Sequence, residues 1–250
     1  RQRLERRPQG YIVVLQRETL TQFEKGRLPA PVRQHLVWGL PPIIDEENLP
    51  FYRQTIGNLI GQGFNSWQIS HLSHLRLFDT MRQKGRGRRQ PLILHGHYTL
   101  NILNSAALYF YEIAGLQGLQ IAVETDVSNL GDLTSHGTRT PFGMTVYGFP
   151  PLFTARLQHA MPYGKIVVSP KKEKFRVVKQ CGQTVVIASQ PFCLLDRQEE
   201  LARARLDFVV VDLTGTRMSR QDWQALNRML KRGWCGSRPA SRFNFDGSLQ

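Results

Sequence analysis

Two imidazoles and two carboxamides lie close together in residues 95–104 (HGHYTLNILN), a segment that reads as the end of a buried strand, a polar turn and the start of a helix. In (β/α) barrels the chemistry takes place at the carboxyl ends of the strands, whereas the opposite edge carries stability. His95 is therefore a candidate catalytic residue. His97, Asn101 and Asn104 are candidate substrate-binding residues. The two asparagines are three positions apart, so both can lie on one face of a helix. The two asparagines could equally cap the helix and satisfy loop carbonyls.

A pair of carboxylates, Glu124 and Asp126, follows the next predicted strand. Paired carboxylates at a strand end suit general acid and base catalysis, so both join His95 as candidate catalytic residues. The structural alternative is that Asp126 and Ser128 begin the following helix, where an anionic side chain interacts favourably with the helix dipole.

A turn near residues 148–151 is flanked by Tyr147 and Arg156, which complete the candidate substrate-binding residues. An arginine at the mouth of a barrel can hold an acidic group in a bidentate contact. In a chain this rich in arginine, the same residue could also be an ordinary surface side chain.

Four histidines stand at two neighbouring strand ends, because His71 and His74 follow the strand that precedes His95 and His97. Imidazoles gathered in this way could hold zinc or iron, with Glu124 or Asp126 completing the ligand set. Isolated histidines more often serve in hydrogen bonding, so we assign no metal ligands.

The net charge is strongly positive, at +14 from 33 Lys+Arg against 19 Asp+Glu. A balance of this size favours binding to polyanions, above all nucleic acid, through contacts with phosphates. A solubilising surface, or a face that meets an acidic partner domain, is the alternative. The candidate nucleic-acid-binding residues are Arg82, Lys84, Arg86, Arg88 and Arg89 in one basic loop, and Lys171 and Lys172 in a second patch.

Short apolar runs alternate with segments of helical spacing from His35 to Lys231, which indicates parallel βαβ units. We predict an α/β fold: an irregular (β/α) TIM-like barrel with a small inserted antiparallel β meander. Residues 1–34 are a lead-in strand and a linker, with Glu24–Gln34 as the linker. Residues 35–232 are the barrel, with the β insertion at about 165–189, and residues 233–250 are a tail.

The three cysteines, Cys181, Cys193 and Cys235, are widely spaced and form no CxxC pair. This pattern supports neither a disulfide framework nor a four-thiolate metal site. A reducing, cytoplasmic setting is therefore expected. No run approaches the roughly 18 apolar residues that a membrane span needs, and the basic N-terminus does not resemble a signal peptide. Since the first residue is Arg, we expect a piece of a longer protein.

Four motifs occur in the order HGHYTLNILNSAA, LQIAVETDVSNLGDL, TVYGFPPLFTAR and LDFVVVDL, and the chain ends near FNFDGSL. Together they resemble the collagenase-like peptidase family U-32, over about residues 35–250. The resemblance implies a (β/α) barrel. It also implies either protease activity or oxygen-independent hydroxylation, of ubiquinone precursors or of a base in tRNA or ribosomal RNA. The hydroxylating relatives hold an iron–sulfur cluster on four cysteines.

The chain departs from that family where its cluster ligands would stand. The family has a cysteine after the P-L-M motif, whereas residues 151–157 read PLFTARL, and the Cys-rich segment downstream is replaced by VVSPKKEKFRVVKQCGQ. A [4Fe–4S] cluster needs four thiolates, so no cofactor is expected in this chain, and any cluster belongs elsewhere in a longer parent protein. The chain resembles a degenerate second barrel of the tandem members of the family.

The expected function is therefore support of RNA (rRNA or tRNA) nucleobase hydroxylation through RNA binding, with a catalytic barrel of the same parent protein as partner and no membrane. The first alternative is a peptidase or collagenase-like hydrolase, although no nucleophile motif such as G-x-S-x-G or H-E-x-x-H is present. The second alternative is a non-catalytic structural barrel that packs on a catalytic domain.

Overall fold

A computed structural model describes residues 8–26, 28–79, 91–135, 139–157, 163–216, 218–232 and 240–247. The chain divides into two compact units. The N-terminal unit holds residues 8–122 and 132–144, and the C-terminal unit holds residues 123–131 and those from 145 onward. Strand β6 and helix α6 each run from one unit into the other.

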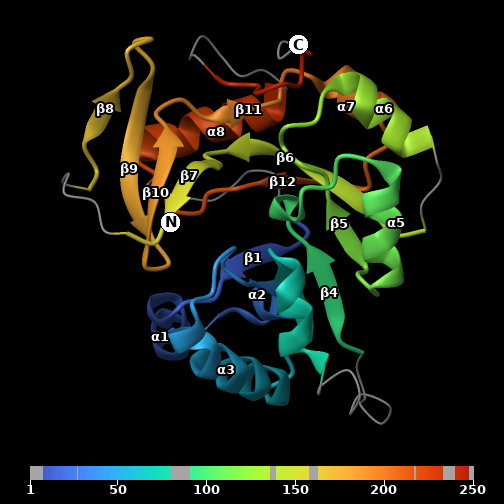
Figure 1. Cartoon of the computed structure of the whole chain (residues 1–250), viewed down its shortest axis with the longest axis vertical. Helices are drawn as coiled ribbons and strands as arrows, with labels where there is room; N and C mark the ends of the chain where they lie inside the picture. The colour runs from blue at the N-terminus through green and yellow to red at the C-terminus, as the bar shows by residue number, and fades with distance from the viewer. Residues whose placement is uncertain are drawn as a thin grey trace. The chain divides into compact units, whose positions relative to one another are not determined.

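The sheet of the N-terminal unit is parallel, and each strand pairs with the next strand along the chain (Figure 1). Its strands are β1 (Tyr11–Val14), β2 (Leu36–Gly39), β3 (Ser66–Ile69), β4 (Ile93–Gly96), β5 (Gly118–Gln120) and the start of β6 (Phe142–Gly148). The predicted βαβ alternation is thus present. The strands are short because each is closed by a polar or glycine-containing turn soon after its apolar run.

Helices connect these strands: α1 (Arg17–Lys25), α2 (Ala30–Gln34), α3 (Leu49–Gly61), α5 (Ser105–Ile113) and α6 (Val127–Ser135), with 3₁₀ turns η1 (Glu46–Asn48), η2 (Leu72–Leu77) and η4 (Tyr98–Leu100). The prediction of a linker at Glu24–Gln34 is wrong, because the end of α1 and all of α2 lie there. Of the two prolines that suggested a linker, Pro29 is the N-cap of α2 and Pro31 lies in its first turn, where a missing N–H is tolerated.

One face of the parallel sheet is apolar and forms the core of the N-terminal unit. Trp38 and Trp67 are fully buried there. Trp38 packs edge-on against Phe23 of α1, at 5.2 Å between ring centroids, and both rings contact Phe64. Buried aromatic rings of this size contribute several kcal/mol each, which explains why a chain with such short strands has a stable sheet.

The C-terminal unit contains the end of β6, which pairs antiparallel with β11 (Phe192–Cys193) and also pairs with β12 (Phe208–Val211). Helices α7 (Gln198–Arg203) and α8 (Arg220–Arg232) belong to the same unit. Gly148 is required where β12 ends, because a Cβ at that position would lie 2.8 Å from the carbonyl oxygen of Asp212.

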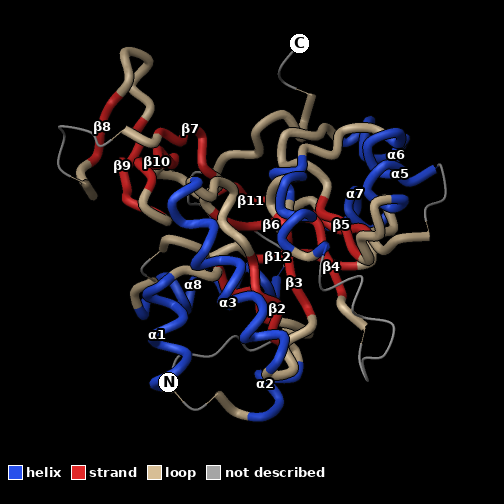
Figure 2. Tube along the Cα trace, turned by 60° about the horizontal axis from the view of Figure 1, so that its bottom comes forward, coloured by secondary structure: helices blue, strands red, loops and turns tan. Residues whose placement is uncertain are grey.

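A separate antiparallel sheet of four strands has the order β7-β10-β9-β8, and its strands lie side by side in Figures 1 and 2. The strands are β7 (Pro151–Ala155), β8 (Ile166–Val168), β9 (Lys174–Gln180) and β10 (Gln183–Ala188). The predicted meander supplies three of them. The fourth, β7, is not predicted from the sequence, which indicates only a turn at about residues 148–151, where β7 begins.

The chain from Ser241 to Gly247, which belongs to the predicted tail, packs onto the C-terminal unit. Ser241 exchanges backbone hydrogen bonds with the β11 region, and Phe243 stacks on Phe192 with ring centroids 5.0 Å apart. Arg242 forms ion pairs with Asp196 and Asp246. The side chain of Phe245 is 1% exposed, so this segment is part of the core.

The described pairings leave the parallel sheet open, because no hydrogen bond joins β1 to β11 or β12. The fold is therefore α/β, with a mainly parallel sheet and a separate antiparallel sheet. Among the described residues, no helix is both long and apolar enough to cross a membrane.

We predict that Phe245→Ala lowers the free energy of unfolding by about 3 kcal/mol, because it leaves a cavity in the core of the C-terminal unit. Phe153→Ala is the matched control, since Phe153 is 60% exposed and its removal should cost less than about 0.5 kcal/mol. Urea unfolding followed by circular dichroism measures both. Equal stability of the two variants would contradict the packing of the C-terminal segment.

Candidate functional site

His95 lies in β4 on the face of the sheet opposite the tryptophans. The register places Gly39, Gln68, His95 and Gly118 side by side across four strands. A Cβ at Gly118 would lie 2.6 Å from His95 Nδ1, so the missing side chain makes room for the imidazole. On the other side, His95 Nε2 is 3.2 Å from the hydroxyl of Ser66. Burial lowers the pKa of His95 below its ordinary value, so the ring is neutral near pH 7.

Gln68 completes this row with a carboxamide on a residue that is only 4% exposed. A neutral imidazole, a hydroxyl and a carboxamide can each donate or accept a hydrogen bond. The row therefore suits an uncharged polar group better than an ion, because no described charged side chain is part of it.

The histidines at the strand ends act as caps of 3₁₀ turns. His97 precedes η4, and its Nδ1 lies 2.9 Å from the Thr99 hydroxyl. His71 precedes η2 and contacts the Ser73 hydroxyl in the same way, at 2.7 Å. Each imidazole is thus held by the turn that follows it, which is the hydrogen-bonding role considered from the sequence.

His74 is a buried residue of η2, and its Nδ1 accepts a hydrogen bond from the Ser70 backbone N–H at 3.3 Å. Burial, and to a smaller extent the nearby His71, lowers the pKa of His74 to about 4. His74 is therefore a neutral structural residue at physiological pH.

The asparagines do not share a helix face. Asn104 is the N-cap of α5, and its Oδ1 accepts a hydrogen bond from Ala107 N–H at 2.8 Å. Asn101 comes before the helix and ends η4 in the left-handed conformation, with φ of 57°. The side chain of Asn101 is exposed, whereas that of Asn104 is engaged with the helix.

The two carboxylates belong to the C-terminal unit, whereas His95 belongs to the N-terminal unit. Asp126 Oδ1 accepts a hydrogen bond from Asn129 N–H at 2.8 Å, so the acid begins α6 as the structural alternative had it. Glu124 is exposed in the preceding turn. Among the described residues, no group of three or more His, Cys, Asp or Glu side chains could hold a metal ion.

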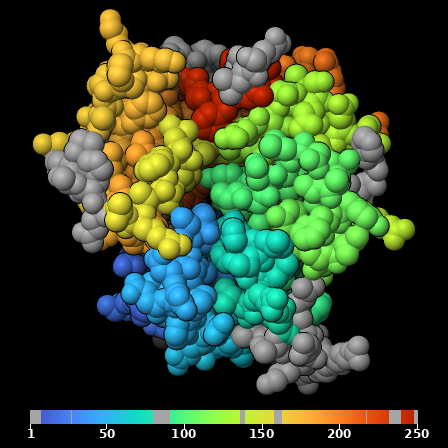
Figure 3. Space-filling view, viewed as in Figure 1, coloured from blue at the N-terminus to red at the C-terminus, as the bar shows by residue number. Residues whose placement is uncertain are grey.

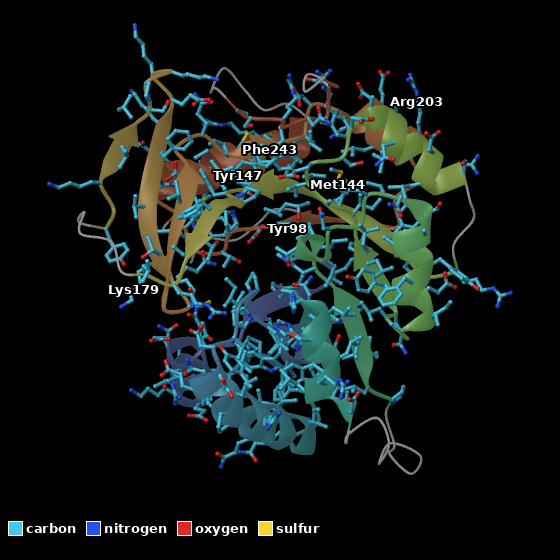
Figure 4. The ribbon with its side chains drawn as sticks, in the orientation of Figure 1. Tyr98, Met144, Tyr147, Lys179, Arg203 and Phe243 are labelled. Carbon is cyan, nitrogen blue, oxygen red and sulfur yellow. The ribbon has the colours of Figure 1, made fainter. Side chains whose placement is uncertain are left out.

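The remaining predicted substrate-binding residues occupy different environments in the C-terminal unit. Tyr147 is buried in β6, where it is labelled in Figure 4. Arg156 is exposed just after β7. The cysteines also differ from one another, since the partly exposed Cys181 forms no disulfide, whereas the buried Cys193 is disulfide-bonded, although the cysteine spacing supported no disulfide framework.

The second basic patch is a well-defined hairpin between β8 and β9. Ser169 and Glu173 close it through three hydrogen bonds: one between their backbones, one from the Glu173 N–H to the Ser169 hydroxyl, and one from that hydroxyl to Glu173 Oε2 at 3.1 Å. Lys171 and Lys172 are exposed at its tip, and Lys172 takes the left-handed conformation with φ of 62°. The first patch, Arg82, Lys84, Arg86, Arg88 and Arg89, lies outside the described residues.

Two residues of the antiparallel sheet region are not found from the sequence, Arg176 and Ser189, whereas Lys174 belongs to the second basic patch. Arg176 alternates with apolar residues in KFRVVKQ, which places it on one face of a strand but does not say which face is covered. Only the pairing of β9 with its neighbours decides that.

Comparison with family models, with curated proteins and with solved structures found no match to this chain. The resemblance to family U-32 thus stays a prediction that rests on the motifs quoted above.

We predict that His74 makes the stability of the protein fall as the pH drops from about 6.5 to about 4. The unfolded chain takes up a proton near pH 6.5, whereas the folded chain resists protonation until about pH 4, so up to about 3 kcal/mol is lost over this range. In His74→Gln this part of the pH dependence should disappear, while His35→Gln, at an exposed position, keeps it. Urea unfolding at a series of pH values measures both, and an unchanged pH slope in His74→Gln would contradict the assignment.

Proposed function

We propose that the chain binds RNA through the antiparallel sheet of its C-terminal unit. The observation that carries this proposal is an excess of cations over acids in the segment that forms this sheet. Residues 151–189 hold seven Lys and Arg and a single acid, Glu173. The Glu173 carboxylate accepts a hydrogen bond from Ser169 inside the hairpin, and one carboxylate can balance at most one of the seven positive charges.

Three arginines elsewhere in the C-terminal unit behave differently. Arg197, Arg203 and Arg242 each pair with a carboxylate, as in the 2.8 Å contact between Arg197 and Asp246. No such pair with a described residue is made by the sheet residues Lys165, Lys171, Lys172, Lys174, Arg176 and Lys179. Unneutralised charges on one sheet attract a polyanion and gain free energy from counterion release.

The same sheet exposes apolar and aromatic surface. Phe153 on the edge strand β7 is 60% exposed, and Ile166 and Val168 on the other edge strand are 59% and 55% exposed. The yellow and orange atoms of this sheet form part of the surface drawn in Figure 3, and Lys179 is labelled near the end of β9 in Figure 4. Aromatic side chains interleaved with cations are typical of surfaces that bind single-stranded RNA, where bases stack on the rings.

The wider setting of this proposal follows from the resemblance. In it, the chain is a degenerate, barrel-like U-32 domain that holds RNA for nucleobase hydroxylation by a catalytic barrel of the same parent protein. The proposed compartment is the cytoplasm, although the disulfide at Cys193 argues against a reducing setting. The alternative of a structural domain is favoured by α5, which exposes Tyr109, Phe110 and Ile113.

A hydrolase is the second candidate, and the contact between Ser66 and His95 favours it. A hydroxyl 3.2 Å from the Nε2 of a neutral imidazole is the geometry of a nucleophile and its base. We predict that any casein or gelatin cleavage by the chain is lost in both Ser66→Ala and His95→Ala and retained in Ser73→Ala. Cleavage that survives both substitutions would rule this pair out.

We predict that RNA binding weakens about tenfold when Lys171, Lys172 and Lys174 are all replaced by Gln, and that the slope of log K against log salt falls by about 2. The matched control replaces Lys25, Arg53 and Arg76, which are exposed cations of the N-terminal unit. Fluorescence anisotropy with a labelled single-stranded RNA, at several salt concentrations, measures both variants. Affinity that is independent of salt, or an equal loss in the control, would contradict the proposal.

A further inference from the structure

Arg176 stands out among the cations of the antiparallel sheet because it is half-buried. It lies in β9 between Ile166 of β8 and Ile187 of β10, and its guanidinium lies over the ring of Phe149, 5.3 Å from the centroid. Its Nε is fully buried and has no hydrogen-bond partner. No described carboxylate pairs with it. The Nε–H of this guanidinium has therefore lost its hydration without gaining a hydrogen-bond partner.

A second unpartnered polar atom lies on the same face of the sheet. Ser189 N–H donates to the carbonyl oxygen of Lys174 at 2.9 Å, so the pairing of β9 with β10 continues one residue beyond β10. This places Ser189 directly opposite Lys174 and diagonally across from Arg176, with a Cβ separation of about 7 Å. The hydroxyl of Ser189 is buried and has no partner.

Lys174 completes the group, because side chains at positions 174 and 176 of one strand point to the same face. Its ammonium is exposed beside the buried hydroxyl and guanidinium. We name Lys174, Arg176 and Ser189 the β9–β10 cluster. It offers a planar fork of N–H donors, a hydroxyl and a second positive charge, and it contains no acceptor-only group.

We propose that the β9–β10 cluster is a phosphate-binding site. A tetrahedral dianion or diester can take two parallel hydrogen bonds from the guanidinium, one from the hydroxyl and a charge contact from the lysine. Such a ligand could bond the two buried polar atoms of the cluster, Arg176 Nε and Ser189 Oγ, which have no hydrogen-bond partner. Phe149 holds the guanidinium plane, so little rotamer freedom remains to be lost on binding.

The phosphate can come from an RNA backbone or from free phosphate, and the first source deepens the function proposed above and rests on it. In that case the β9–β10 cluster would fix one phosphate in place, while the exposed lysines of the hairpin attract the strand without fixing its position. The chemistry of the cluster is the same for either source.

The first experiment follows the Arg176 side-chain Nε–H signal by NMR while inorganic phosphate is added to the whole chain. We expect a saturable shift of this signal that is lost in Ser189→Ala and is larger than the shift caused by acetate. Shifts of equal size at Arg176 and at the exposed Arg220 would overturn the site, as would a larger effect of acetate.

The second experiment measures RNA affinity for Arg176→Gln, Arg176→Lys and the control Arg220→Gln in the same unit. We expect Arg176→Gln to weaken binding about tenfold and to lower the salt slope by about 1, while Arg176→Lys weakens binding but keeps the slope. Arg220→Gln should stay within about twofold of the parent chain. Circular dichroism confirms that each variant is folded.

The two proposals fail separately. If the parent chain does not bind RNA at low salt, the proposed function is wrong, and the phosphate titration still decides the site. If RNA binds and Arg176→Gln changes neither affinity nor slope, the RNA role of the β9–β10 cluster is wrong, whereas binding through the exposed lysines stands.

Discussion

The pairing of β9 with β10 determines which side chains of the antiparallel sheet face one another. Val177 and Val185 are buried, on opposite faces, and the turn between the two strands is Cys181-Gly182, where both residues have positive φ, of 50° and 79°. A two-residue turn of this kind matches the twist of the flanking strands and fixes their register. A shift of one residue would move every β9 side chain to the other face. Arg176 would then lose both Phe149 and Ser189, so the arrangement of charge depends on a turn and two buried valines.

Counter-charge divides the C-terminal unit into two kinds of surface. Where Arg197 and Arg242 meet Asp196, Asp246 and Glu200, both arginines have counter-charges, and the ion pairs attach the C-terminal segment to the body of the unit. On the antiparallel sheet, residues 151–189 contain a single acid, Glu173, against seven Lys and Arg, so positive charge is in excess there. Positive charge is therefore distributed unevenly over this unit, and the antiparallel sheet favours anions. Composition gives the net charge of the chain but not the position of this surface.

In the N-terminal unit, the polar row that contains Gln68 and His95 has no charged side chain. Gly39 and Gly118 border Gln68 and His95 in one row of the parallel sheet, and the space at Gly118 is taken by the imidazole. Burial keeps that imidazole uncharged. The contact between His95 and Ser66 can be a structural hydrogen bond or a nucleophile with its base. Its geometry fits both roles, and only the binding of a substrate beside it would distinguish them.

The alternation of strands and helices, the antiparallel meander and the basic character of the chain could all be predicted from the amino-acid sequence. Local rules suffice for these, because hydrophobic period, turn residues and charge are properties of neighbouring positions. The helix-capping roles of Asn104 and Asp126 were also among the alternatives that the sequence offered. Three features are visible only in the folded structure: the strand β7, the packing of Phe245, and the face of the sheet that Arg176 shares with Ser189. Each of these depends on pairing between residues distant in the chain, for which a local pattern holds no information.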